Sequence, residues 1–242
     1  MPTELTTNEA AHSKAVRDMF AGIAGRYDFL NHVLSLNIDK IWRRKVSRIL
    51  RDVLNRPDAV VLDVACGTGD LSLELNREAK AQVIGTDFCR PMLTVAKAKT
   101  LSANAAVPYI EADAMSLSFA DNGFDAVTIA FGLRNLPNVA NGLTELHRVL
   151  KPGGKLVILE FSSPIVPGFR QLFNFYFANI LPRIGGAVSG SRGAYEYLPD
   201  SVSKFPNQKA LAALMEKTGF SAVSYQNLTG GIAALHSGTK TR

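Results

Sequence analysis

The sequence contains few cysteines and few histidines. Its 242 residues include two cysteines, Cys66 and Cys89, and four histidines scattered along the chain. Two thiols are too few for a scaffold held together by disulfides, and no cysteine or histidine pair has the spacing of metal ligands. We therefore expect no metal centre. No histidine lies where a general base can be assigned from the sequence, so that role stays unassigned.

Long apolar segments are absent as well. The N-terminal segment MPTELTTNEAAHSK lacks the apolar centre of a signal peptide, and no run of about 18 apolar residues occurs. We expect a cytoplasmic protein, and peripheral contact with the inner face of a membrane stays open. Basic residues outnumber acidic ones, and the net charge of +6 permits an anionic partner without distinguishing nucleic acid, membrane or acidic substrate.

Short β-branched segments alternate with amphipathic helical segments through the middle of the chain. Because the strand segments are apolar on both sides, this alternation predicts an α/β fold with a mostly parallel, doubly wound sheet. Two segments near the C-terminus, 220–228 and 232–240, predict an antiparallel hairpin that brings the sheet to seven strands. The other predicted strands are 59–65, 81–87, 107–113, 124–131 and 154–162, and the helices between them are 70–78, 90–100 and 138–150.

We predict a single domain, 1–242, built from four parts. A helical N-terminal cap precedes a cofactor-binding core, and a lid inserted after the fifth strand precedes a C-terminal helix with the antiparallel hairpin. The four parts are 1–57, 58–162, 163–206 and 207–242.

The stretch VVLDVACGTGDLSLEL, residues 60–75, is a strand, a tight glycine turn and a helix start. Open α/β sheets bind ligands at the carboxyl ends of their strands, where Gly67 and Gly69 lie. The run G-x-x-x-x-G-K-[ST] of a nucleotide phosphate loop is absent, and Ser72 occupies the position of the third glycine of a dinucleotide fingerprint. A G-x-G pair alone is equally compatible with an ordinary strand-to-helix turn.

Three acidic residues at strand ends narrow the choice of ligand. Asp63 precedes the turn, Asp87 ends the second strand, and Asp113 ends the third. A row of carboxylates suits ribose hydroxyls, an adenine amino group and cationic sulfonium and ammonium groups, whereas it repels a pyrophosphate. The pattern D-x-x-x-G-x-G therefore indicates S-adenosyl-L-methionine and a class I methyltransferase fold.

This interpretation assigns cofactor contacts to seven residues. Asp87 is expected to take the ribose hydroxyls. Asp113 flanks the adenine, with a helix N-cap as the alternative, and Asp63 orients the turn or the ammonium group, with structural support nearly as plausible. The remaining contacts are Gly67, Thr68 and Gly69 for the methionine and ribose portion, and Ala114 for the adenine.

Four motifs resemble the UbiE/MenG family of quinone C-methyltransferases along almost the whole chain. They are YDFLNHVLSLNIDKIW (27–42), FGLRN (131–135), RVLKPGGKLVILEFS (148–162) and YEYLPDSVSKFP (195–206). The resemblance implies methylation of demethylmenaquinol to menaquinol, or of the ubiquinol precursor 2-polyprenyl-6-methoxy-benzoquinol. This chain has Ala130 where family members often have serine, which removes one hydroxyl contact to the cofactor.

The resemblance also points to residues around the acceptor, a prenylated quinol. Arg134 and Asn135 are expected to hydrogen-bond the quinol oxygens, and an ion pair between Arg134 and a lid carboxylate is the alternative. Tyr27, with Asp28, is expected to close over the cofactor, with core packing as the alternative. The aromatic segment 167–182 is expected to form a groove for the isoprenoid tail, with core packing or a dimer contact as alternatives.

Two rival functions and one surface stay open. The rivals are a methyltransferase of another hydrophobic phenol or lipid, and a cofactor-binding subunit without catalysis. Nucleic acid is not expected as the acceptor, because the basic helical segment 39–52 lacks the interleaved aromatics of a stacking platform. That segment is either a solvated face or a contact for anionic lipid. A homodimer stays open.

Overall fold

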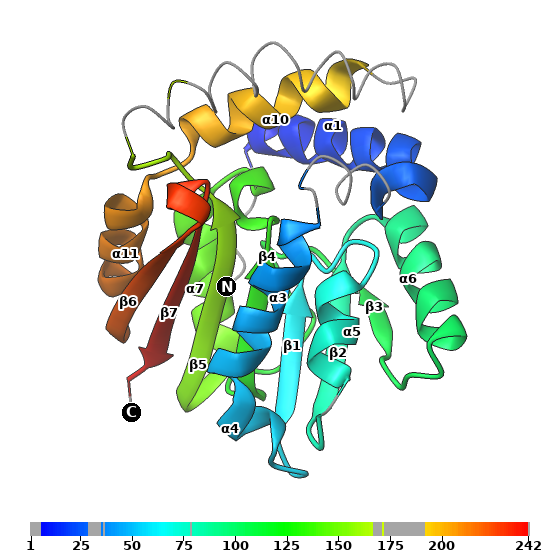
Figure 1. Cartoon of the computed structure of the whole chain (residues 1–242), viewed down its shortest axis with the longest axis vertical. Coiled ribbons are helices and arrows are strands. Elements are labelled where there is room, and N and C mark those ends of the chain that lie inside the picture. The colour runs from blue at the N-terminus through cyan, green and yellow to red at the C-terminus, as the bar shows by residue number, and fades with distance from the viewer. Residues whose placement is uncertain are drawn as a thin grey trace.

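A computed structural model describes residues 6–28, 35, 37–77, 79–166, 171 and 192–241, with the backbone alone for 192–196. A seven-stranded sheet in the order β3-β2-β1-β4-β5-β7-β6 forms its centre (Figure 1). The strands are β1 (Val60–Val64), β2 (Gln82–Asp87), β3 (Tyr109–Glu111), β4 (Phe124–Ala130), β5 (Leu150–Phe161), β6 (Phe220–Leu228) and β7 (Ala233–Lys240).

The predicted sheet is confirmed, including its antiparallel hairpin. Strands β1 to β5 pair in parallel, and β7 runs antiparallel to both of its neighbours, β5 and β6. The hairpin is folded back so that β7 lies between β5 and β6. Strand β3 is shorter than the predicted 107–113, because Asp113 enters a turn in which its carboxylate accepts the backbone N–H of Met115 at 2.9 Å.

Helices cover both faces of the sheet. Neighbouring residues of β1 point to opposite faces, so Val61 packs under one helix layer and Leu62 under the other, and both are fully buried. One layer contains α3 (Ile38–Ile49), α4 (Arg51–Leu54), α5 (Asp70–Asn76) and α6 (Arg90–Ser102), and the other contains α7 (Val139–Val149) and α11 (Gln208–Lys217).

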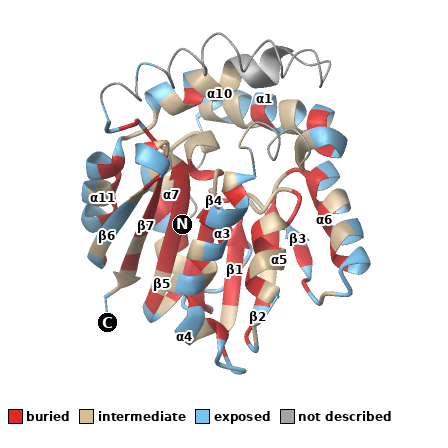
Figure 2. Ribbon diagram, in the orientation of Figure 1, coloured by how far each residue is buried: buried red, intermediate tan, exposed pale blue. Residues whose placement is uncertain are grey.

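Two helices cross the carboxyl edge of the sheet, above the ends of the parallel strands. These are α1 (Thr7–Ile23), which begins with a capping box between Thr6 and Glu9, and α10 (Arg192–Lys204). They lie side by side at the top of Figure 1, whereas the most buried residues lie in the sheet below them (Figure 2). Short 3-10 turns complete the described chain: η1 (Ala24–Arg26), η2 (Leu133–Asn135) and η4 (Thr229–Gly231).

The described residues bear on the expectation about membrane spans, but they leave out most of the predicted lid. Within the described ranges, every helix is too short or too polar to cross a bilayer. The aromatic segment 167–182 of the predicted lid lies outside the described residues, apart from position 171.

Candidate active site

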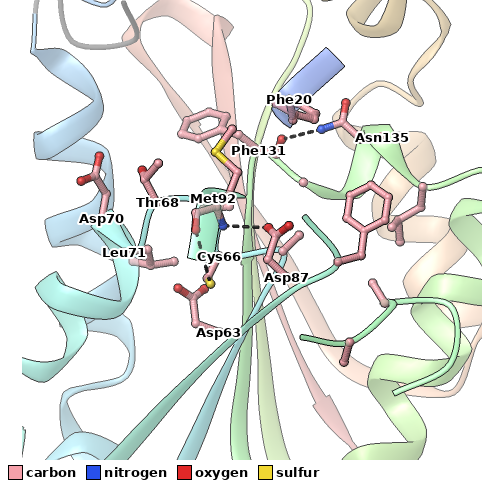
Figure 3. Close-up of a pocket in the computed structure, with 18 of the residues that line it drawn as sticks. Phe20, Asp63, Cys66, Thr68, Asp70, Leu71, Asp87, Met92, Phe131 and Asn135 are labelled. Carbon is pink, nitrogen blue, oxygen red and sulfur yellow. Dashed lines mark hydrogen bonds between the residues drawn. The ribbon is translucent and has the colours of Figure 1, made fainter. Parts of the chain in front are cut away.

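A cavity opens at the carboxyl edge of the sheet, between the ends of β1, β2 and β4 and the cap formed by α1 and η1 (Figure 3). Its empty volume is about 920 Å³, including solvent at its mouth. The cavity brings together eight of the residues predicted from the sequence, whereas Gly69 and Arg134 do not line it. The eight are Tyr27, Asp63, Gly67, Thr68, Asp87, Asp113, Ala114 and Asn135.

The glycine turn holds two glycines with different roles. Both adopt left-handed backbone conformations, with φ of 56° at Gly67 and 82° at Gly69, which glycine adopts without strain. Gly67 faces the cavity, and its N–H donates to the Asp87 carboxylate at 2.8 Å. A Cβ on Gly69 would lie 2.5 Å from the Tyr109 hydroxyl. Gly69 is therefore required by the packing of α5 against β3, and it does not reach the cavity.

Asp87 is a buried carboxylate with capacity left for a ligand. One oxygen accepts the N–H of Gly67, and the other accepts the N–H of Cys89 at 2.9 Å. Burial disfavours the charge and raises the pKa of Asp87 from 3.8 to about 6, although the backbone N–H groups of Cys89, Gly67 and Phe88 lower it. Each carboxylate oxygen has a second lone pair, so the group can still accept two hydroxyl donors from a ribose.

Asp63 ties three elements together beneath the turn. Its oxygens accept the hydroxyl of Ser72 on α5 at 2.6 Å and the hydroxyl of Thr128 on β4 at 2.8 Å. Burial raises its pKa to about 6, and these two hydroxyls lower it. Ser72 is the residue that breaks the dinucleotide fingerprint, and its hydroxyl supports the acid that begins the D-x-x-x-G-x-G pattern. Asp63 thus supports the turn and also lines the cavity, and its contact with the ammonium group stays a prediction.

Apolar side chains and a second acid line the cavity together with Asp87. Asp113 and Ala114 line one side, and Phe88 and Met92 line the cavity nearby. One oxygen of Asp113 is used by the turn, so the other is available to a ligand amino group. Sequence reasoning did not identify Phe88 and Met92, although the position of Phe88 directly after the strand-end Asp87 was a usable signal.

A network of charged and polar side chains joins the N-terminal cap to the glycine turn. Asp28 follows η1 in the cap and accepts the hydroxyl of Thr68, a residue of the turn. The same carboxylate pairs with Lys99 of α6 at 2.6 Å. The Thr68 hydroxyl, which we expected to contact the cofactor, is thus donated to the cap.

The network continues along one side of the cavity. Lys99 also contacts Asp70 at the start of α5, and Asp70 lies 3.3 Å from Arg43 of α3, which pairs in turn with Asp39. Arg43 and Asp70 both line the cavity. Their side chains are only 10% and 18% exposed, so solvent screens this part of the network weakly. Four segments of the chain supply these charged groups, and no local pattern in the sequence predicted that they pair with one another.

Tyr27 lies beside the glycine turn, and its role in closing over the cofactor stays a prediction. It lines the cavity and packs edge-on against Phe20 of α1, with 5.8 Å between ring centroids. A Cβ on Gly67 would lie 3.9 Å from the Tyr27 ring, which places the ring directly beside the turn.

Arg134 is buried beneath the cavity wall. Its guanidinium donates to Glu160 of β5 at 2.8 Å and to the carbonyl of Phe131, and it lies 5.3 Å above the Phe161 ring. The side chains of Arg134 and Glu160 are 6% and 1% exposed. The ion pair expected as an alternative for Arg134 does form, but its carboxylate comes from strand β5 and not from the lid.

Asn135 is held at the cavity by contacts with helices α1 and α10. Its side-chain NH₂ donates to the Phe131 carbonyl at 3.3 Å, and its amide oxygen accepts the hydroxyl of Tyr197 on α10 at 3.2 Å. A ring nitrogen of His12 on α1 lies 3.2 Å from the Asn135 backbone oxygen. The α1 and α10 contacts were not predicted, because each joins residues more than 60 positions apart.

The cavity matches S-adenosylmethionine in its donors and acceptors. It has the buried acid Asp87, a second acid, Asp113, beside apolar side chains, a glycine turn and the Asn135 amide. Arg43 is the single cation among the described residues that line it, whereas a pyrophosphate would need several. These features and the strand order define a methyltransferase of the class I α/β fold. Phosphoethanolamine N-methyltransferase 2 of Haemonchus contortus, solved in complex with S-adenosyl-L-methionine, shares this fold. Its TM-score is 0.62 at 17% identity, over 83% of this chain and 53% of that chain.

Sequence comparison defines the family within this class. The model of the ubiE/COQ5 methyltransferase family matches residues 7–240, and this chain belongs to that family. The demethylmenaquinone methyltransferase of Thermus thermophilus is 48% identical over 92% of this chain and 100% of its own length. The ubiquinone/menaquinone biosynthesis C-methyltransferase UbiE of Geobacter sp. is 46% identical over 93% of this chain and 96% of its own length.

Proposed function

We propose that this protein methylates a ring carbon of demethylmenaquinol, giving menaquinol, with S-adenosylmethionine as the methyl donor. The proposal rests on one observation: a single cavity is lined both by the strand-end acids Asp63, Asp87 and Asp113 and by the Asn135 amide. Family membership and the names of the full-length relatives support the same reaction.

In this proposal the acids at the strand ends hold the cofactor. Asp87 accepts the two ribose hydroxyls, and Gly67 lets the backbone approach the ligand. Asp113 accepts the adenine amino group while Phe88 and Met92 cover the ring. Arg43 and Asp70, at the other end of the cavity, lie where the charged amino-acid portion would meet them.

The acceptor must be electron-rich. When bound, S-adenosylmethionine supplies an electrophilic methyl group, and an oxidised quinone ring would not react with it. The reduced quinol can react, because loss of a hydroxyl proton moves electron density onto the neighbouring ring carbon. Much of the rate then comes from alignment of that carbon, which the cap secures by covering the cavity and excluding water.

Asn135 and Arg134 receive different roles. Asn135 faces the cavity, where its amide can hydrogen-bond a quinol oxygen and stabilise developing negative charge. Arg134 acts as a positioning residue, because its guanidinium binds Glu160 and the Phe131 carbonyl, the same carbonyl that holds the Asn135 side chain.

Methyl transfer from labelled S-adenosylmethionine to demethylmenaquinone, with and without a strong reductant, tests the proposal. We expect labelled menaquinone in the reduced sample alone. Equal transfer without reductant would exclude the quinol mechanism, and no transfer despite cofactor binding would exclude this acceptor.

The relatives' names include ubiquinone as well as menaquinone biosynthesis, so the benzoquinol precursor is a second acceptor to test. A competition assay with both reduced acceptors gives the ratio of their kcat/KM values. We expect transfer to demethylmenaquinol to dominate, and a ratio favouring the benzoquinol would reassign the acceptor.

A further inference from the structure

The outer face of helix α3 presents a row of cations to solvent. Lys40, Arg44, Arg48 and, just past the helix end, Arg51 are exposed, and they follow one another at intervals of three or four residues. Such spacing places their side chains along a single stripe of the helix. Ile41 lies beside the stripe and is 53% exposed, which is unusual for a large apolar residue in this protein.

The inner face of the same helix is fixed in the core. Trp42 and Val46 are buried in the hydrophobic layer between α3 and the sheet, and the Trp42 indole N–H donates to the hydroxyl of Thr229 at 3.0 Å. Arg43 is held by Asp39 and Asp70. The helix cannot rotate without breaking these contacts, so the outer cations keep a fixed place on the surface.

These cations have no ion-pair partner within the described part of the chain, in contrast to three exposed cations on other helices. Lys14 pairs with Asp18, Arg90 with Glu111, and Lys204 with Asp200, all at 2.6–2.8 Å. Like charges three or four residues apart on a helix repel one another. An unpaired stripe of this kind is stabilised when an extended anionic surface meets it.

The stripe lies next to the candidate active site. Lys40 and Arg44 line a surface hollow between α3, α5 and the end of α6. Arg43 and Asp70 line both this hollow and the cavity. Helix α3 stands at the front of Figure 1, with its first turn directly below the cap, so a surface that met the stripe would lie beside the mouth of the cavity.

We propose that the outer face of α3, comprising Lys40, Ile41, Arg44, Arg48 and Arg51, docks on an anionic lipid bilayer. The proposal rests on the proposed function, because a quinol with an isoprenoid tail partitions into a bilayer and has to be taken from it. Docking is electrostatic, since the apolar side of α3 is occupied by the core and Ile41 alone can enter the headgroup region. A nucleic acid is a weaker match, because the stripe carries no aromatic side chain for base stacking.

The test compares two variants that lose the same amount of charge. In the first, Lys40, Arg44 and Arg48 of the stripe are replaced by glutamine, which preserves helix propensity and cannot disturb an ion pair. In the second, the control, Lys14, Arg90 and Lys204 are replaced by glutamine; these are 73–81% exposed and lie on other elements. Flotation with vesicles of phosphatidylglycerol and phosphatidylcholine, and with phosphatidylcholine alone, measures binding.

We expect the natural protein to bind only the anionic vesicles and to be released by high salt. The stripe variant should bind on the order of 100-fold more weakly, from about a fivefold loss per cation near an anionic surface, and the control variant should bind nearly as the natural protein does. An equal loss of vesicle binding in both variants would show that net charge alone drives binding, and it would contradict docking through α3. Binding to duplex DNA but not to vesicles would reassign the stripe to nucleic acid.

Activity separates this proposal from the proposed function. All three proteins should methylate a short-tailed, water-dispersed demethylmenaquinol at equal rates, because the stripe lies outside the cavity. With a long-tailed quinol embedded in anionic vesicles, the stripe variant alone should be slow. Failure of the natural protein on the short-tailed quinol would contradict the proposed function, whereas equal rates on embedded quinol would contradict docking through α3.

Discussion

Replacement of Asp87 by asparagine should separate cofactor binding from stability. The carboxylate is 6% exposed, and burial raises its pKa from 3.8 to about 6. At neutral pH the folded protein therefore spends about 3 kcal/mol to keep this group ionised. Asparagine removes that cost, but its NH₂ then faces one of the two backbone N–H groups that the carboxylate accepts, which costs about 1–3 kcal/mol.

The two effects nearly cancel at pH 7, so we expect the free energy of unfolding of Asp87→Asn to lie close to that of the natural protein. The difference depends on pH. The folded-state pKa is raised, so the stability contributed by the Asp87 carboxyl is fully present below about pH 4 and is lost as pH rises through about 6. The stability of the variant relative to the natural protein should thus increase by about 3 kcal/mol from pH 4 to pH 7. Asp63, whose pKa is also about 6, titrates in both proteins and largely cancels, because the charge of Asp87 is the smallest of the causes that raise the pKa of Asp63.

Cofactor binding should change in the opposite direction. The ribose hydroxyls lose a charged acceptor, and the loss of about 2–4 kcal/mol corresponds to roughly 30- to 1,000-fold weaker binding of S-adenosylmethionine at pH 7. In the natural protein, affinity should fall as pH drops below about 6, because Asp87 becomes protonated, whereas the variant should show a flat profile. Urea unfolding followed by Trp42 fluorescence and isothermal titration calorimetry measure the two quantities. Unchanged affinity, or the same pH profile in both proteins, would refute the assignment of Asp87 to the ribose.

Two further changes test ion pairs that the sequence did not indicate. Lys99→Met removes the cation between Asp28 and Asp70, so the cap should open more readily and bind S-adenosylmethionine about 5- to 30-fold more weakly, the equivalent of about 1–2 kcal/mol. The control is Lys97→Met, a change at an exposed position on the same helix. Isothermal titration calorimetry measures the affinity of both variants for S-adenosylmethionine, and equal affinities would contradict a role for the ion-pair network. Arg134→Met leaves the carboxylate of Glu160 buried without its cation and should lower the free energy of unfolding by about 3–5 kcal/mol. Adding Glu160→Gln should restore much of that stability in urea unfolding but not methyl transfer, and recovery of both would show that Arg134 has a structural role alone.

The sequence by itself determined the class of the fold and placed the strand-end acids and the glycine turn at one edge of the sheet. Alternating apolar segments and turns are local patterns, so they predicted five of the strands, the hairpin and the helices between them. The position of Asp87 at the end of the second strand was also predictable, because parallel strands that follow one another through a helix end at the same edge. Gly67 and Asp87, 20 positions apart, are consequently joined by a hydrogen bond at 2.8 Å.

Only the tertiary structure decided which groups meet across that edge. The sequence marked Arg134 as a residue for the quinol oxygens, but the fold buries its guanidinium against Glu160, a residue that no pattern had distinguished. It likewise places Asp28 on Thr68 and Lys99, and inserts β7 between β5 and β6. Hydrophobic periodicity and turn preferences act over a few residues, whereas these contacts depend on the packing of elements distant in sequence, where a shift of a single side chain changes the partner of a charge.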